Sequence, residues 1–74
     1  MFTITETSDP EGETFWVRHD RKHVTIICAE TGNGGAQRFE LGWTHRGLSD
    51  YDPICFASSR SQAEAIAKTE LRRF

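Results

Sequence analysis

Hydrophobic and polar residues alternate with a period of two through most of the first 43 residues, and this alternation predicts a β-sheet. Residues 14–19, 23–30 and 37–43 carry the pattern most clearly, and residues 2–6 carry it over a shorter span. Because successive side chains of a strand point to opposite sides of the sheet, one register gathers the apolar side chains on one face. The predicted core face comprises Phe15, Val17, Val24, Ile26, Cys28, Phe39, Leu41 and Trp43.

The connection before residues 37–43 contains Asn33-Gly34, a pair that favours a two-residue type I′ turn because both residues tolerate positive φ. Such a turn fixes which residues face each other across the hairpin. A slip of one residue would place Glu40 opposite Ile26 and lose the apolar match, so the pattern and the turn chemistry predict the same register. The predicted pairs are Glu30 with Gln37, Cys28 with Phe39, Ile26 with Leu41, and Val24 with Trp43.

Residues 60–74 follow the period of an amphipathic helix. Ser59 and Gln62 form a capping-box pattern at its start, in which a hydroxyl and a side chain three residues later satisfy unpaired backbone N–H groups. Glu64 and Lys68 lie four residues apart and support the solvent-facing side of this helix. The apolar stripe that is predicted to cover the sheet comprises Ala63, Ile66, Ala67, Leu71 and Phe74.

Two stretches, residues 7–13 and 44–57, are predicted to be loops, because turn-forming residues break their pattern. The second loop accommodates one helical turn, and we expect Leu48 and Tyr51 to anchor it on the body of the protein. The chain is therefore predicted to form one α+β domain over residues 1–74. This domain is a four-stranded, mainly antiparallel β-meander packed on one face by a single C-terminal helix (ββββα).

Composition is that of an ordinary globular chain, with 36% hydrophobic and 27% charged residues and a mean hydropathy of -0.57. No apolar run approaches the roughly 20 residues of a membrane helix. The first residues also lack the basic and apolar regions of a signal peptide. We therefore expect a cytoplasmic location and no contact with a membrane.

The residues that bind metals in other proteins are not arranged for that purpose here. Cys28 and Cys55 lie far apart, and we expect both to stay reduced and to pack as small hydrophobic residues. His19 and His23 have a spacing found in zinc motifs, but on a hairpin they fall on opposite faces. The sequence predicts neither a metal site nor another cofactor.

The predicted second face of the sheet carries large apolar side chains beside arginines, a composition typical of protein interfaces. Three alternatives account for it: residues 2–6 or 44–57 fold over it, a homodimer covers it, or it binds a different partner. We expect a non-enzymatic protein-binding module. The size of the chain suits a small accessory protein of the kind that phages and mobile elements use to block a host complex by stoichiometric binding. The expected partner contacts are Trp16, Arg18, Ile27 and Arg38, flanked by Arg21 and Lys22.

Two other functions compete with protein binding. Trp16 with the cluster of Arg18, Arg21, Lys22 and Arg38 has the composition of a single-stranded nucleic-acid site, although the net charge of -2 argues against it. A small hydrolase would use His45, which lies near Asp50 and Asp52 in the sequence. The glycine-rich segment 31–36 lacks the Lys-Ser/Thr ending of a phosphate-binding loop, so a hairpin turn explains it better.

Overall fold

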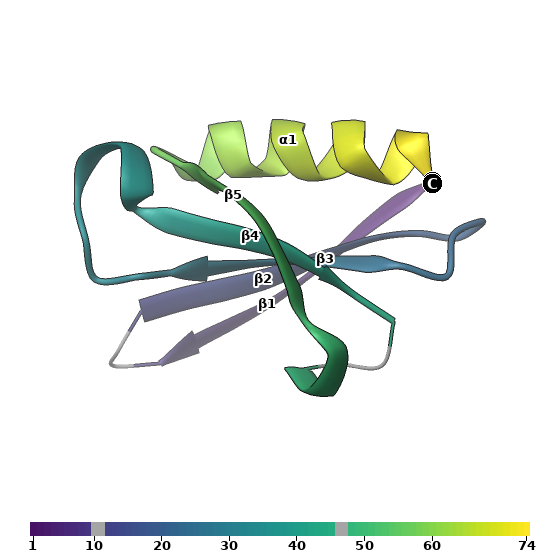
Figure 1. Cartoon of the computed structure of the whole chain (residues 1–74), viewed down its shortest axis with the longest axis horizontal. Coiled ribbons are helices and arrows are strands. Elements are labelled where there is room, and N and C mark those ends of the chain that lie inside the picture. The colour runs from purple at the N-terminus through teal and green to yellow at the C-terminus, as the bar shows by residue number, and fades with distance from the viewer. Residues whose placement is uncertain (10–11, 46–47) are drawn as a thin grey trace.

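The computed structural model describes residues 1–9, 12–45 and 48–74, and it shows an antiparallel sheet covered on one face by one helix (Figure 1). Each strand pairs with its neighbours in the chain, in the order β1-β2-β3-β4-β5. The predicted α+β class, the antiparallel meander and the C-terminal helix are confirmed. The elements are β1 (Phe2–Asp9), β2 (Gly12–His19), β3 (Thr25–Glu30), η1 (Gly35–Gln37), β4 (Phe39–Thr44), η2 (Leu48–Asp50), β5 (Asp52–Ala57) and α1 (Arg60–Arg73).

The sheet has five strands, and the prediction of four was wrong. The fifth, β5, lies within the segment 44–57 that was predicted to be a loop. Pro53 interrupts its β-pattern, and it is tolerated because β5 is an edge strand with only one neighbour. A register irregularity between Leu41 and Gly42 of β4 accommodates the mismatch, so that Gly42 pairs with Pro53.

The N-terminal hairpin is also longer than predicted. Strand β1 continues to Asp9, which pairs with Gly12 at the start of β2, so most of the predicted loop 7–13 is strand. Gly12 has a φ of +148°, which favours glycine at this turn. Residues 10–11 of that loop, and residues 46–47 of the second predicted loop, lie outside the described part of the chain.

Strands β3 and β4 pair two residues away from the predicted register. Cys28 faces Leu41 and Ile26 faces Trp43. Because side-chain orientation repeats every two residues, this shift leaves every residue on its predicted face. The prediction of the pairs was wrong, while the prediction of the inner face is confirmed.

The turn chemistry explains the register error. The described non-glycine residues, Asn33 among them, have no positive φ, and Gly34 is extended with φ -102° and ψ -178°, so these two residues do not form a type I′ turn. The left-handed positions are instead Gly32 and Gly35, at +84° and +62°. The loop closes where the Thr31 N–H donates to the carbonyl oxygen of Arg38 at 2.9 Å.

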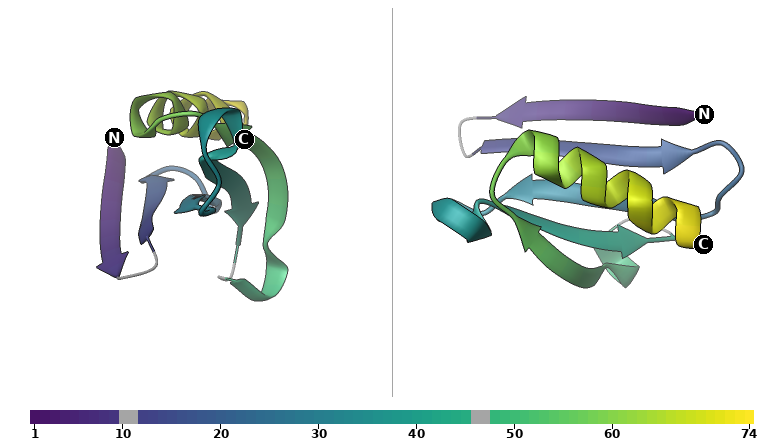
Figure 2. Two further views of the ribbon diagram at one scale, coloured as in Figure 1. Left: turned by 90° about the vertical axis from the view of Figure 1, so that its left-hand side faces the viewer. Right: turned by 90° about the horizontal axis from the view of Figure 1, so that it is seen from above.

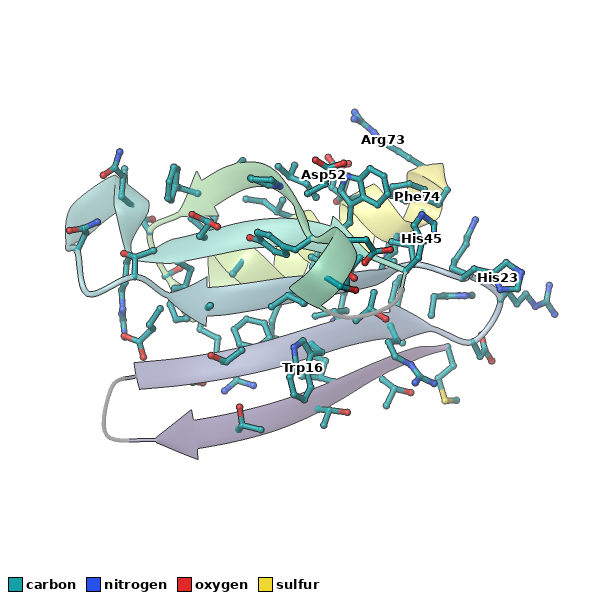
Figure 3. All side chains as sticks on the ribbon, turned by 60° about the horizontal axis from the view of Figure 1, so that its bottom comes forward. Trp16, His23, His45, Asp52, Arg73 and Phe74 are labelled. Carbon is teal, nitrogen blue, oxygen red and sulfur yellow. The ribbon has the colours of Figure 1, made fainter. Side chains whose placement is uncertain are left out.

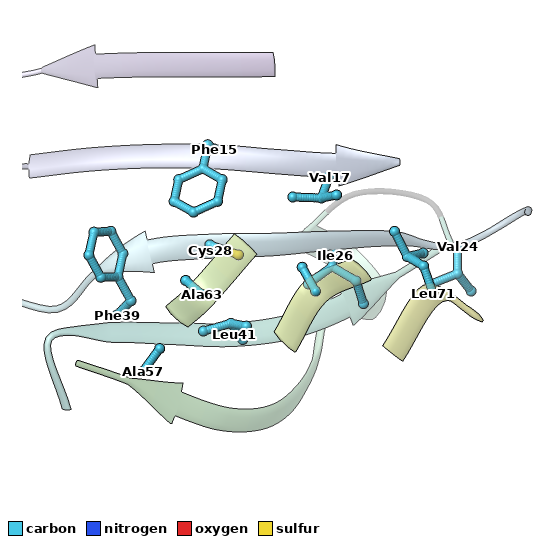
Figure 4. Packing of buried hydrophobic residues seen from close by; sticks show 11 residues of the cluster. Phe15, Val17, Val24, Ile26, Cys28, Phe39, Leu41, Ala57, Ala63 and Leu71 are labelled. Carbon is cyan, nitrogen blue, oxygen red and sulfur yellow. The ribbon is translucent and has the colours of Figure 1, made fainter. Parts of the chain in front are cut away.

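The core lies between the sheet and α1 (Figure 4). Seven of the eight predicted core-face residues are buried, and Trp43 is half-buried against them. Ala63 and Ala67 of α1 are fully buried, and their small side chains allow the helix to approach the sheet closely. Phe74, predicted to complete the helical stripe, is 46% exposed and touches Trp43 with ring centroids 5.4 Å apart.

Helix α1 begins as its sequence predicts. The Ser59 hydroxyl accepts a hydrogen bond from the Gln62 N–H at 3.1 Å, which is the first half of the capping box. In the second half the Gln62 side chain reaches one residue further back, where it accepts from the Ser58 N–H at 2.6 Å. Glu64 pairs with Arg60 at 2.9 Å, one turn before its predicted partner Lys68.

Arg60 joins three elements of the fold. Its guanidinium pairs with Glu6 of β1, Glu13 of β2 and Glu64 of α1. It also lies 4.7 Å from the ring centroid of Phe15, so a cation–π contact accompanies the ion pairs. One side chain thus ties the start of the helix to the first two strands.

We expect Arg60→Ala to lower the melting temperature more than Arg73→Ala does. Arg73 is the matched control, because its side chain is 74% exposed and pairs with Glu70 at 3.6 Å. Arg60 holds the pKa of Glu6 below its ordinary value of 4.5 through a hydrogen bond and its charge. The stabilisation that the Arg60–Glu6 pair provides is therefore fully present above pH 4.5, and it is lost as the pH falls through the lowered pKa of Glu6.

Thermal denaturation followed by circular dichroism at neutral and acid pH tests this prediction. The difference between the two variants should shrink in acid and at high salt, because protonation and screening both weaken the ion pairs. Equal melting temperatures for the two variants at neutral pH would show that the Arg60 pairs do not hold the helix to the strands.

Candidate binding groove

The sheet face opposite α1 carries a hollow of about 390 Å³, here called the groove. Figure 3 is turned toward this face and labels Trp16 on β2. Two neighbouring rows of paired residues in the sheet form the groove. In the first row, Trp16 of β2 lies between Thr5 of β1 and Ile27 of β3. In the next row on the same face, Arg18 pairs with Thr25. Because residues two apart share a face, the β-pairing alone gathers these side chains. The groove is lined by Thr5, Trp16, Arg18, Thr25, Ile27, Thr44 and His45.

Tyr51 covers the neighbouring part of this face. Its ring packs against the backbone of Gly42, where a Cβ atom would overlap it, and its hydroxyl donates to Glu40 at 2.8 Å. Burial and this hydrogen bond raise the pKa of the Tyr51 hydroxyl. The prediction that Tyr51 anchors its segment is confirmed, whereas the side chain of Leu48 lies outside the described part of the chain.

The segment after β4 places His45 at the rim of the groove. Asp50 accepts hydrogen bonds from the Thr44 hydroxyl and, at 3.3 Å, from the main-chain N–H of His45. The imidazole of His45 packs edge-on against Trp43, with ring centroids 5.3 Å apart. Asp50 therefore acts as the structural support of this turn.

The predicted contact residues have different positions. Trp16 and Arg18 both line the groove, where Trp16 is half-buried and Arg18 is exposed. Ile27 is only 5% exposed, so it forms the floor of the groove and offers a partner little surface. Sequence reasoning did not assign Thr5 or Thr44 to the site, because their positions depend on the pairing of β1 with β2 and of β3 with β4.

Arg38, which was predicted to belong to the basic cluster, lies apart from Arg18. It precedes β4 at the end of the sheet where β3 finishes, whereas Arg18 faces Thr25 at the start of β3. The length of β3 separates these ends by roughly 17 Å. Arg38 instead pairs with Glu30 at 3.7 Å and lies 5.2 Å from the ring centroid of Phe39.

Arg21 and Lys22 lie in the connection between β2 and β3. They border a second hollow of about 280 Å³ that His45 shares with the groove. Lys22 is held there, because its Nζ donates to the main-chain oxygen of Phe74 at 2.6 Å. Of the four predicted cations, only Arg18 lines the groove, whereas Arg21 and Lys22 border the second hollow.

The cysteines are poor nucleophiles in this environment. Cys28 is fully buried, and burial raises the pKa of its thiol to about 12. Cys55 is half-buried, and burial raises its pKa as well. Both side chains are therefore protonated near neutral pH and unreactive. Within residues 1–9, 12–45 and 48–74, no three metal-binding side chains come together.

The described helices do not include one with the length and apolar character needed to cross a membrane. Comparison of the chain with protein-family models, with curated proteins and with solved structures finds no match. We therefore infer function from the geometry and chemistry of the groove.

Proposed function

We propose that this protein is a non-enzymatic protein-binding module whose partner occupies the groove. The observation that carries the proposal is the meeting of Trp16 and Arg18 in one open hollow, on the sheet face that α1 leaves uncovered. Tryptophan and arginine are the side chains most often responsible for binding energy at protein interfaces. A chain of 74 residues with such a surface can block a larger complex stoichiometrically without any catalytic group.

The surroundings of Trp16 suit this role. Its indole is half-buried between Thr5 and Ile27, so it loses little conformational freedom when a partner covers the remaining surface. Arg18 and the hydroxyls of Thr5 and Thr25 supply hydrogen bonds that orient the partner. Ile27 supplies an apolar floor against which a partner side chain can exclude water.

The chemistry of the other groups supports binding over catalysis. Both thiols are protonated, and Asp50 supports the turn on which His45 stands. A hydrolase would require His45 and a carboxylate to act on a substrate in the groove. The His45→Ala variant distinguishes the two functions. It would abolish a hydrolase activity, but it leaves Trp16 and Arg18 in place and should therefore still bind the partner.

We expect Arg18→Glu to weaken partner binding by about thirtyfold, equivalent to about 2 kcal/mol, with little change in stability. Arg18 is exposed, so its replacement leaves the core intact. Arg73→Glu makes the same charge change on α1, where the side chain is 74% exposed, and it should bind as the wild type does. Trp16→Ala should weaken binding similarly and also lower stability, because Trp16 is half-buried.

The measurement has two stages. The tagged wild type is used to capture partners from a lysate of the native host, with and without nuclease, and the purified partner is then titrated against each variant by calorimetry. Binding that survives nuclease and is lost in Arg18→Glu supports a protein partner. Binding that disappears with nuclease, or that is unchanged in both Arg18→Glu and Trp16→Ala, contradicts the proposal.

A further inference from the structure

The two edges of the sheet are protected to different degrees. Strand β5 contains Pro53, begins with the exposed Asp52, and pairs irregularly with β4. Proline, charge and irregularity are the features by which natural edge strands avoid pairing with another chain. Strand β1 pairs with β2 in an unbroken register from Phe2 to Asp9, and those eight residues include neither proline nor lysine.

The backbone of β1 offers a row of unpaired groups on its outer side. The Asp20 N–H donates to the carbonyl oxygen of Met1 at 3.2 Å, so the facing pair of Met1 and Asp20 is a hydrogen-bonded one. Such pairs alternate along an antiparallel ladder. The odd-numbered residues therefore bond to β2, and the even-numbered residues direct their N–H and C=O groups outward. Among the described residues none lies beyond this edge, as Figure 2 shows.

We infer that β1 is a dimerisation edge, at which two copies of this chain pair antiparallel and extend the sheet across a two-fold axis. In an antiparallel pair both facing residues must direct their backbone groups to the new partner, so an even-numbered residue must face an even-numbered one. Pairing Ile4 with Glu6 of the second copy satisfies this condition and overlaps nearly the whole strand. Pairing Glu6 with itself would set like charges opposite each other.

This register is self-complementary in its side chains as well. Thr5 lies on the two-fold axis opposite its own copy, and Thr3 faces Thr7 of the second copy, which are favourable cross-strand pairs. The Glu6 carboxylate is paired with Arg60 of the same chain, and in this register it faces the uncharged Ile4 and not a second carboxylate. Ile4 is half-buried at the edge of the core, so the second copy would cover its remaining apolar surface.

The choice of a second copy over a foreign strand rests on this symmetry. When the segment Thr3-Ile4-Thr5-Glu6-Thr7 pairs antiparallel with its own copy, each threonine faces a threonine on the sheet face that carries the groove. All three threonines are exposed in the single chain. Because the axis is perpendicular to the sheet, both helices would lie on one side of the ten-stranded sheet and both grooves on the other.

Charge reversal at Thr5 tests the inference directly. Thr5→Lys and Thr5→Glu each place like charges opposite each other on the axis, so each variant alone should dimerise at least about tenfold more weakly than the wild type. A one-to-one mixture of the two variants should restore association, because opposite charges then meet. Thr69→Lys and Thr69→Glu are the matched controls, because Thr69 is exposed on α1.

Sedimentation equilibrium over a range of concentrations up to about 1 mM provides the measurement. We expect the mass of the wild type and of the Thr69 variants to approach two chains, and the mass of each Thr5 variant to stay near one chain unless they are mixed. Circular dichroism would confirm that all variants fold. A wild type that stays at one chain throughout, or Thr5 variants that dimerise as the wild type does, would overturn the inference.

Discussion

Phe39→Ala is expected to lower the free energy of unfolding by about 3–5 kcal/mol, the largest effect of any substitution considered for this chain. Phe39 is fully buried and packs edge-on against Phe15, with ring centroids 5.9 Å apart. It belongs to the cluster that joins the sheet to α1, so its truncation leaves a cavity in the core. Because a chain of 74 residues has only about 5–10 kcal/mol of stability in total, this loss removes a large part of the free energy of unfolding.

Phe56→Ala provides the control for this prediction. It removes the same atoms from the adjacent strand β5, but the Phe56 side chain is 45% exposed. We expect the loss for Phe56→Ala to be less than half that for Phe39→Ala, because a partly exposed side chain gains less on burial. Urea denaturation followed by tryptophan fluorescence measures both values. Equal losses would mean that Phe39 does not occupy the core as described.

Gly42→Ala is expected to cost about 1–3 kcal/mol, although it adds a single methyl group. A Cβ atom at this position would overlap the Cε1 and Cζ atoms of the Tyr51 ring. Tyr51 cannot move aside freely, because its hydroxyl is hydrogen-bonded to Glu40 at 2.8 Å. The substitution should therefore displace Tyr51 and loosen the segment that it anchors beside the groove.

Gly34→Ala is the matched control, since no atom lies within 4 Å of its added Cβ and its backbone is extended. We expect Gly34→Ala to change the unfolding free energy by less than about 0.5 kcal/mol. A double-mutant cycle isolates the clash: in a Tyr51→Ala background, Gly42→Ala should cost much less than it does in the wild type. The same cost in both backgrounds would show that Tyr51 does not pack on Gly42.

The inner face of the sheet could be predicted because it depends on a local period. Phe15, Ile26 and Leu41 lie on the core side whatever the exact register, provided that the register changes by an even number of residues. This is why the prediction of the core survived an error of two residues in the pairing of β3 with β4. The start of α1 was predictable for the same reason, since Ser59 and Gln62 are neighbours on one turn.

The candidate site could be predicted only in part. The shared face of Trp16 and Arg18 follows from their spacing along β2, and both line the groove. The burial of Ile27 and the separation of Arg38 from the other cations did not follow from any local pattern. The burial of Ile27 and the position of Arg38 both depend on how strands that are distant in the sequence pair with each other.

The amino-acid sequence by itself determined which side chains face inward and where the final helix begins, because both follow from the spacing of near neighbours along the chain. Only the tertiary structure decided that residues 52–57 form a fifth strand, that Tyr51 packs on Gly42, and that Trp16, Arg18 and His45 border one groove. These features join residues far apart in the sequence. There, burial and backbone pairing on an existing sheet outweigh the weak local preference of a segment such as Asp52–Ala57, which contains a proline.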